Sequence, residues 1–525
     1  MLNETRKDFF NAADYFLDRN IRQGKGHRIA VYTEYKNYTY NDIQKMTNKT
    51  ANGFRELGVR ADDKIMILMI DVPQFYAVFW GAIKIGAIPI PVNTMLTPED
   101  YEYYLNDSRA KVLVVSEQIL PVINQIKGEL FYLRDMIVIS EVNGAHIPFK
   151  QKYWHAPATI KIENTTKDDV GFWLYSSGST GSPKGAVHSQ YDMVVTSQSF
   201  AQAVLGITED DVCFSAARLF FAYGLGNGMY FPMSVGASAV LNPNPPTPEN
   251  VFRHLEKFRP TIFFGIPTLY GQMLEYKEKH DREYGTFKDA NSDHEFSSVR
   301  ICVSAGEALP QDIFERWKKR FGIEILDGIG STEMLHIFLS NRPGQIKPGS
   351  TGKPVPSYEL KLFDDEGKEV PQGEIGTLFV KGDSAAQQYW RKREKSRHTM
   401  QGEWINTGDK YYVDEEGFYW CAGRADDMLK VGGIWVSPVE VENCLSQHPA
   451  VFECAVIGAL DEKGLIKPKA YVVVRDGFER SEELAENLKK WVLERLAKYK
   501  YPRWIEFVDK LPKSTTGKIQ RFKLR

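Results

Sequence analysis

The sequence has almost no net charge and no long apolar segment, and each absence excludes a class of protein. Its 66 Lys and Arg residues are balanced by 68 Asp and Glu residues, which leaves a formal charge of −2. This balance provides no long-range field for nucleic acid or for an anionic membrane. The longest apolar runs, such as Ile65 to Ile70, end at charges after six residues, whereas a membrane helix requires ~20. We therefore expect no nucleic-acid partner and no membrane association.

Cysteine is also scarce. The five cysteines are widely scattered and have neither CxxC nor metal-ligand spacing, so they predict reduced core residues rather than a disulfide framework or a zinc site. The segment from Met1 to Asp8 has no apolar signal region, and the final residues, 523–525, do not match a Ser-Lys-Leu peroxisomal address. These features predict a cytoplasmic protein.

The length predicts at least two domains, because 525 residues exceed the roughly 250–300 at which one hydrophobic core stops growing. Short apolar strands alternate with helical segments, as in the predicted strand 64–71, helix 74–85 and strand 111–116, and this alternation is typical of helices packed on sheets. A polar, glycine-bearing connection follows Arg424. We predict an α/β fold with a large N-terminal domain of packed sheets at 1–425 and a small α+β domain at 426–525.

The small domain is predicted to contain helices at 438–446 and 482–498 and strands at 453–457 and 469–474. The second helix has an apolar stripe at Leu484, Leu488, Val492, Leu493 and Leu496. Such a stripe is expected to face the domain core.

The most informative motif is the segment from Tyr175 to Gly185, which reads YSSGSTGSPKG. Its glycines let backbone N–H groups approach an anion closely, and its hydroxyls and Lys184 add further donors. The preceding run, 170–174, predicts a buried strand, so the loop would follow the end of a sheet, where α/β proteins bind ligands. The spacing excludes a Walker loop. A Ser/Gly-rich segment can also be a solvated linker, but a linker does not need to end in Pro-Lys-Gly. The motif therefore favours a site for the phosphates of ATP.

This loop resembles the phosphate loop of the adenylate-forming superfamily, which includes the acyl-CoA and aryl-CoA synthetases. Five later segments agree with that superfamily in order and spacing: 304–309, 327–333, 407–409, 423–427 and 512–518. The resemblance implies a two-step reaction. A carboxylate attacks the α-phosphorus of ATP to give an acyl-AMP and diphosphate, and a thiol then displaces AMP.

The resemblance also implies which residues bind ATP. The phosphates would contact Ser177, Gly178, Ser179, Thr180, Gly181, Lys184 and Thr332. Glu333 would hold Mg²⁺, a hard cation that prefers carboxylate oxygens. The adenine would lie against Gly306, Glu307, Ala308, Asp327 and Gly328, and the ribose hydroxyls would bind Asp409 and Arg424.

The same resemblance assigns the catalytic lysine of the first half-reaction and the residues of the second. Lys518 matches the catalytic lysine, so Lys518, Thr332 and Glu333 are the predicted catalytic residues. Asp426 matches the hinge for a domain rotation between the two steps. Gly432 and Gly433 would line a pantetheine tunnel with Phe221 at its gate. Coenzyme A is the predicted thiol substrate on the family likeness alone. A homodimer and a lysine acetyltransferase acting on Lys518 are further predicted partners.

The segments 220–227 and 327–338 resemble those of the benzoate-CoA ligases within this superfamily. They imply an aryl-acid pocket formed by Ala222, Tyr223, Gly328, Ile329 and His336. Its apolar walls favour benzoate. His336 or Tyr223 could provide a polar partner for a ring substituent, so hydroxy-, amino- and fluorobenzoate are alternative substrates. An alternative is an enzyme that loads the aryl group onto a carrier-protein phosphopantetheine. A nucleotide sensor without turnover is disfavoured, because it has little use for Lys518.

Overall fold

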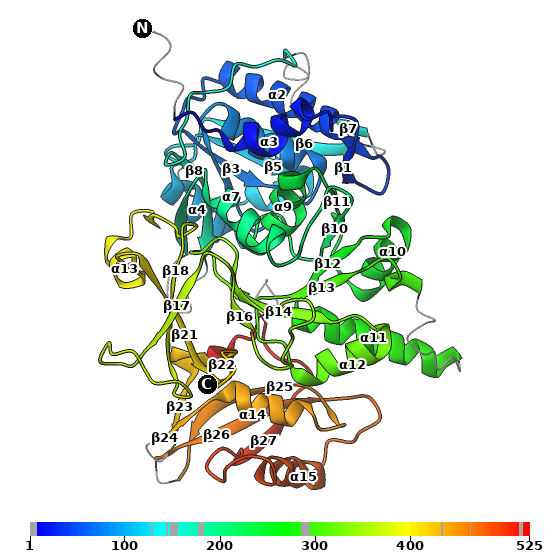
Figure 1. Ribbon diagram of the computed structural model, residues 1–525, viewed down its shortest axis with the longest axis vertical. Helices are drawn as coiled ribbons and strands as arrows, with labels where there is room; N and C mark the ends of the chain where they lie inside the picture. The colour runs from blue at the N-terminus through cyan, green and yellow to red at the C-terminus, as the bar shows by residue number, and fades with distance from the viewer. Residues whose placement is uncertain are drawn as a thin grey trace.

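The computed structural model describes residues 8–126, 128, 130–142, 145–147, 156–176, 183–284, 294–431, 434–462, 464–513 and 518–525. The predicted phosphate-loop residues Ser177 to Gly181 and the tunnel residues Gly432 and Gly433 lie outside this part of the chain. Figure 1 shows several packed sheets with helices between them, and the last hundred residues, in orange and red, lie at one end of the molecule below α12 (Gln311–Phe321).

A nine-stranded sheet forms the centre of the molecule, in the order β16-β15-β14-β13-β12-β10-β11-β1-β2. Its strands are β1 (Ile29–Tyr32), β2 (Tyr38–Thr39), β10 (Val212–Ser215), β11 (Ser238–Val240), β12 (Ile262–Gly265), β13 (Ile301–Ser304), β14 (Ile325–Gly330), β15 (Ile337–Ser340) and β16 (Lys353–Pro354). The run from β1 through β14 is parallel. The carboxyl ends of β13 and β14 therefore open at the same edge.

Helices α10 (Pro248–Phe258), α11 (Pro267–Tyr284) and α12 bury their apolar faces against this sheet. Leu255, Tyr270 and Trp317 from the three helices join Phe214 and Phe263 from β10 and β12 in one buried cluster. Parallel strands need such helical crossovers, so this packing follows from the strand order.

A second sheet has the order β4-β3-β5-β6-β7. Its strands are β3 (Lys64–Leu68), β4 (Ile88–Pro91), β5 (Val112–Ser116), β6 (Asp135–Val142) and β7 (Ala145–Ile147). Helices α2 (Tyr40–Glu56) and α3 (Pro73–Lys84) cover one face, and α4 (Pro98–Ser108) covers the other. Alternate β3 residues therefore enter different cores: Ile65 and Ile67 join one cluster, and Met66 and Leu68 join another.

Two antiparallel sheets complete the large part of the chain. One contains β8 (Val170–Ser176), β9 (Lys184–Ser189) and β19 (Gln388–Tyr389), and the predicted phosphate loop connects β8 to β9. The other contains β17 (Glu359–Phe363), β18 (Gly376–Lys381), β20 (Met400–Gln401), β21 (Trp404–Val413) and β22 (Tyr419–Arg424). Helix α13 (Arg393–Thr399) lies between β19 and β20 in the chain.

The C-terminal part has its own core. Strands β25 (Val451–Leu460), β26 (Ile466–Val474) and β27 (Trp504–Phe507) form a sheet, beside the hairpin of β23 (Leu429–Val431) and β24 (Ile434–Val436). Helix α14 (Pro438–Ser446) has the predicted bounds, and with α15 (Glu482–Leu493) it packs on this sheet.

The predicted helix 482–498 is wrong at its end. Helix α15 stops at Leu493. The chain then turns, and the N–H groups of Arg495 and Leu496 both donate to the Val492 carbonyl. Leu493 is 38% exposed, so it does not extend the apolar stripe into the core.

Two expectations from composition can be compared with the structure. All five cysteines are free, and four of them are buried. No helix among the described residues is long and apolar enough to cross a membrane.

Candidate active site

The ends of β13 and β14 bring together the residues predicted for adenine. Gly306 follows β13 with a φ of 100°, a left-handed conformation that favours glycine. The carboxyl of Asp327 on β14 is buried and accepts N–H groups from Leu309 and Gly328. Burial raises its pKa well above the usual value. Its Oδ1 atom has no hydrogen-bond partner among the described residues, so it can take a partner from a bound molecule.

The turn from β14 to β15 carries both a predicted catalytic pair and a predicted pocket residue. Leu335 in this turn has a φ of 66°, which is strained for a residue with a branched side chain. The turn is closed by backbone bonds from Leu335 to Thr332 (3.2 Å) and from His336 to Met334 (2.8 Å). Glu333 and His336 consequently lie three residues apart on one rigid connection.

Residues that the sequence did not predict hold this turn in place. His188 is fully buried on β9, and its Nε2 donates to the carbonyl of Thr332 at 2.8 Å. Its Nδ1 lies 2.8 Å from the carboxylate of Asp192. Ser384 donates its hydroxyl to the carbonyl of Met334 at 2.8 Å. The available signal was a polar residue in the buried strand that follows the phosphate loop.

Glu333 lies beside Lys184 and an unpredicted tyrosine. The Tyr389 hydroxyl donates to Glu333 Oε1 at 2.6 Å, and the Lys184 ammonium lies 4.7 Å from the centroid of the Tyr389 ring. Burial lowers the pKa of Lys184, and the charge of Glu333 partly offsets this effect. The structure therefore brings together the lysine of the phosphate motif and the predicted metal ligand.

Asp409 and Arg424, the predicted ribose pair, are partners in the hairpin of β21 and β22. The Arg424 guanidinium donates to Asp409 Oδ1 at 3.0 Å and to the carbonyl of Thr407 at 3.1 Å. Gly408 has a φ of 71°, and a Cβ atom there would lie 3.1 Å from the guanidinium. Glycine at 408 thus permits the close approach of these two side chains.

His336 and Tyr223 form the wall of the predicted aryl pocket, with ring centroids 5.5 Å apart. Nε2 of His336 lies 3.1 Å from Asn227 Oδ1 and 3.3 Å from the Tyr223 carbonyl. Both partners accept, so Nε2 carries the proton. Burial lowers the pKa of His336 to about 3, and the ring is neutral. Its Nδ1 is buried without a partner among the described residues and can accept a hydrogen bond.

The other predicted pocket residues are buried or partly buried. Ala222 and Ile329 are partly buried against the same core cluster, and Gly328 is buried on β14 beside β15. The Tyr223 hydroxyl donates to the Val303 carbonyl at 3.2 Å, so its proton is already used. Phe221 precedes the short helix α8 (Ala222–Leu225). Its ring packs against that of Phe220, with ring centroids 4.5 Å apart.

The C-terminal part contacts this site through the residue after Lys518. The N–H of Ile519 donates to Glu307 Oε1 at 2.7 Å. Burial raises the pKa of Glu307, while the nearby positive charge of Lys518 acts in the opposite direction. A second connection pairs Arg475 with Asp312 of α12 at 3.3 Å. Lys518 is consequently held next to the segment that is predicted to bind adenine.

The predicted hinge, Asp426, lies in the short turn η6 (Ala425–Asp427) between β22 and β23. The Arg525 guanidinium donates to the Asp426 carbonyl at 3.1 Å and to Asp427 Oδ1 at 2.6 Å. The hinge segment is therefore bound by the end of the chain that also carries Lys518.

The donor set suits one kind of metal ion. Among the described residues, no cluster of three or more His, Cys, Asp or Glu side chains could hold a metal, and Glu333 is the carboxylate beside the phosphate motif. Mg²⁺ is commonly bound by one or two carboxylates together with substrate phosphates. The residues present fit an ion that arrives with a nucleotide.

Polar groups at the ends of parallel strands, together with the contact between Ile519 and Glu307, fit an adenylate-forming enzyme. Family models for the AMP-binding enzyme and for its C-terminal domain match residues 17–390 and 440–518. The chain belongs to the AMP-binding enzyme family.

Three relatives refine this assignment. The chain is 48% identical to a benzoate–CoA ligase of Thauera aromatica, over 98% of this chain and 96% of the relative. It is 42% identical to a 4-hydroxybenzoate–CoA/benzoate–CoA ligase of Rhodopseudomonas palustris, over 98% of this chain and 94% of the relative. A solved anthranilate CoA ligase in complex with anthranoyl-AMP has a TM-score of 0.92 at 46% identity, over 100% and 98%. The predicted fold and the resemblance to benzoate-CoA ligases are confirmed.

Proposed function

We propose that the protein is an AMP-forming aryl-CoA ligase that converts benzoate, or a close analogue, to its CoA thioester through an aryl-AMP. The observation that carries this proposal is one turn that joins Thr332 and Glu333 to His336. It connects the ATP site to an apolar pocket for a ring. Full-length similarity to benzoate-CoA ligases supports the same reaction.

The first step requires a carboxylate and ATP to meet without charge repulsion. Lys184 and the phosphate loop neutralise the outer phosphates, and Thr332 contacts the α-phosphate. Glu333 holds Mg²⁺, which supplies positive charge to the phosphate oxygens. Tyr389 fixes the Glu333 carboxylate by donating to Oε1. Lys518 lies between the substrate carboxylate and the α-phosphate, where negative charge accumulates.

The proposed nucleoside site combines groups from β14 and from the hairpin of β21 and β22. Asp327 offers its unpartnered Oδ1 to the adenine, which lies against Gly306, Glu307, Ala308 and Gly328. The carboxylate of Asp409 accepts hydrogen bonds from the ribose hydroxyls, and Arg424 orients this carboxylate.

The ring of the acid lies among Ala222, Tyr223, Ile329 and His336. The Tyr223 hydroxyl is occupied by Val303, which favours an unsubstituted ring at that wall. His336 can accept a donor through Nδ1, which allows an amino or hydroxyl substituent on its side. Benzoate is therefore the proposed main substrate, and 2-aminobenzoate is the analogue that this geometry tolerates.

The second step requires the small domain to rotate about Asp426, with a boundary at 425/426. Separate buried cores before and after that boundary support the division. Phe221 gates the path of the thiol, and Gly432 and Gly433 line it. A cytoplasmic location, a homodimer and acetylation of Lys518 belong to the same proposal.

The acceptor is tested by one assay with purified protein, Mg²⁺, ATP and a panel of acids. Benzoate, 4-hydroxybenzoate, 2-aminobenzoate and acetate are compared by diphosphate release, with and without CoA. Rapid formation of benzoyl-CoA supports the ligase. If the reaction stops at aryl-AMP until a phosphopantetheine carrier is added, the enzyme loads a carrier protein instead. The absence of acid-dependent diphosphate release contradicts both.

A further inference from the structure

A row of cations crosses three neighbouring strands at the edge of the second sheet. In the parallel register Ile65 is opposite Val112, and Val112 is opposite Asp135. The preceding residues, Lys64, Lys111 and Arg134, are therefore adjacent as well, and backbone bonds join Lys111 to Lys64 (2.9 Å) and Arg134 to Lys111 (2.8 Å). Neighbouring strands lie about 4.8 Å apart, and parallel partners point to the same face. Three positive side chains consequently leave one face of the sheet side by side.

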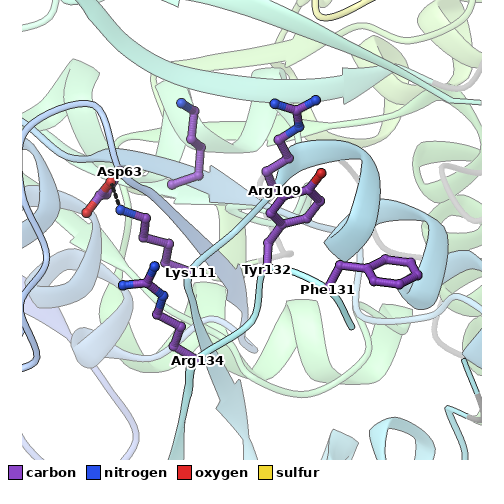
Figure 2. Close-up of a pocket in the computed structure, with 7 residues that line it drawn as sticks. Asp63, Arg109, Lys111, Phe131, Tyr132 and Arg134 are labelled. Atoms are coloured by element: carbon purple, nitrogen blue, oxygen red, sulfur yellow. Dashed lines mark ion pairs between the residues drawn. The ribbon is translucent and has the colours of Figure 1, made fainter. Parts of the chain in front are cut away.

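The face in question is the one covered by α4. Met66 and Leu113, which follow Lys64 and Lys111 by two residues, are buried in the cluster that contains Tyr101 of α4. Arg109 follows the end of α4 in a left-handed conformation with a φ of 57° and adds a fourth cation. These side chains line a cavity of about 270 Å³, together with Asp63, Phe131 and Tyr132. Figure 2 shows Lys111 beside Arg134, and Arg109 beside Tyr132.

The positive charge of this pocket is only partly compensated. Lys111 pairs with Asp63 at 2.5 Å, and no ion pair to Lys64, Arg109 or Arg134 exists among the described residues. Lys64 instead lies 5.4 Å and 5.8 Å from the ring centroids of Trp390 and Trp173, and Arg109 lies 5.2 Å from that of Tyr132. Burial lowers the pKa of Lys64. The charges of Asp62 and Asp63 oppose this effect, and those of Lys111 and Arg109 add to it.

Like charges that face one another across strands are destabilising. A sheet edge that carries three of them is stabilised when an anion with two or more charges lies between them. Guanidinium groups match phosphate oxygens in a fork geometry, and a lysine adds a point charge. The cavity is large enough for a phosphate or diphosphate group. None of its lining residues belongs to the ATP site or to the aryl pocket.

We propose that Lys64, Arg109, Lys111 and Arg134 form a second anion site, separate from the active site, which binds the phosphate or diphosphate group of a small molecule. The exposed Tyr132 ring beside Arg109 offers a flat surface for a ring attached to that group.

Calorimetric titration of the purified protein with inorganic diphosphate, without Mg²⁺ or ATP, tests the site. The test variant is Arg109→Gln/Arg134→Gln, which removes two cations that have no ion pair among the described residues. The control is Lys36→Gln/Lys167→Gln, whose ammonium groups lie against the rings of Tyr38 and Tyr191 in the same manner. We expect saturable binding to the wild type and the control, and at least ten-fold weaker binding to the test variant.

Thermal unfolding provides a second readout that does not depend on activity. Diphosphate should raise the Tm of the wild type and of the control. The test variant should start at an equal or higher Tm, because charge repulsion is removed, and should gain less with diphosphate. Equal affinity of the wild type and the test variant overturns the proposal, and so does a wild-type Kd weaker than about 1 mM. A lower starting Tm of the test variant also contradicts the argument from repulsion.

A titration with ADP distinguishes the two sources of the anion. If ADP binds this pocket more tightly than diphosphate, and Tyr132→Ala removes the difference, the ligand is a nucleotide. If the two bind equally, free diphosphate is sufficient. In either case the affinity must fall in Arg109→Gln/Arg134→Gln. Binding at the active site would not be changed by these two substitutions.

Discussion

The N–H of Ile519 and the carboxylate of Glu307 are joined by a hydrogen bond of 2.7 Å between the small and large parts of the chain. The two residues are 212 positions apart in the sequence. Because Ile519 follows Lys518, this bond sets where the lysine lies. Glu307 thereby acquires a role in positioning Lys518, beyond its predicted contact with adenine.

Replacement of Glu307 should separate the two half-reactions. A hydrogen bond to a charged acceptor is worth about 1.5–3 kcal/mol, so Glu307→Ala should slow aryl-AMP formation by about ten-fold to a hundred-fold. Thioester formation from supplied aryl-AMP should be spared, as it should be in Lys518→Ala. Glu307→Gln keeps an acceptor oxygen and should recover part of the rate. Equal losses in both half-reactions would contradict the positioning role.

The hinge can be tested by restricting one backbone angle. Proline fixes φ near −65°, so Asp426→Pro should hold the small domain in one arrangement. We expect aryl-AMP formation to persist and thioester formation to fall by at least about ten-fold. Asp426→Ala, which leaves φ unrestricted, is the matched control. An unchanged thioester rate in the proline variant would show that the rotation does not occur at Asp426.

Tyr389 should matter to catalysis although no motif marks it. Tyr389→Phe removes the 2.6 Å bond to Glu333 and leaves the ring beside Lys184. We expect kcat to fall about ten-fold and the Mg²⁺ concentration for half-maximal rate to rise. Tyr412→Phe, at a ring stacked on Trp420, is the control. A normal Mg²⁺ dependence in Tyr389→Phe would exclude this role.

His336 should shape the pocket without titrating at neutral pH. Its pKa is lowered to about 3 by burial, so the ring stays neutral throughout the range in which an ordinary histidine ionises, and kcat/KM for benzoate should show no step from it near pH 6.5. His336→Ala should raise KM for benzoate about ten-fold through lost packing. His336→Phe restores volume and should recover benzoate while selecting against 2-aminobenzoate. Loss of both acids to the same extent in His336→Phe would contradict the proposed acceptor.

Glu275 of α11 should make stability depend on pH. Burial raises its pKa to about 7, although Arg475 and Arg316 oppose the shift. The folded protein therefore retains a proton that the unfolded chain releases near pH 4.5, and this contribution to stability is lost as the pH rises to 7. Glu275→Gln should raise Tm at pH 8 and leave it unchanged near pH 4. Glu278→Gln, which removes an ion pair to Arg316, should give no such gain. Equal Tm values for Glu275→Gln and the wild type at pH 8 would contradict the assignment.

The sequence predicts the fold and most of the candidate site because both depend on local patterns. Strand β5, helix α14 and the motif around Thr332 follow from runs of neighbouring residues. The contacts of His188 with Thr332 and of Tyr389 with Glu333 span 144 and 56 positions. Such pairs arise only when separate sheets pack, so no local pattern marks them. The end of α15 was missed because an apolar stripe continues beyond the last helical turn.

The strained turn at Leu335 couples the position of His336 to the position of Glu333. His336, the ring proposed to contact the acid, and Glu333, the carboxylate proposed to serve the phosphates, are three positions apart on a segment held by His188 and Ser384. A bulkier acid that displaces His336 also displaces Glu333. If these roles hold, engineering this chain for larger acids should reduce turnover unless the enlargement is made outside this turn, for example at Ala222.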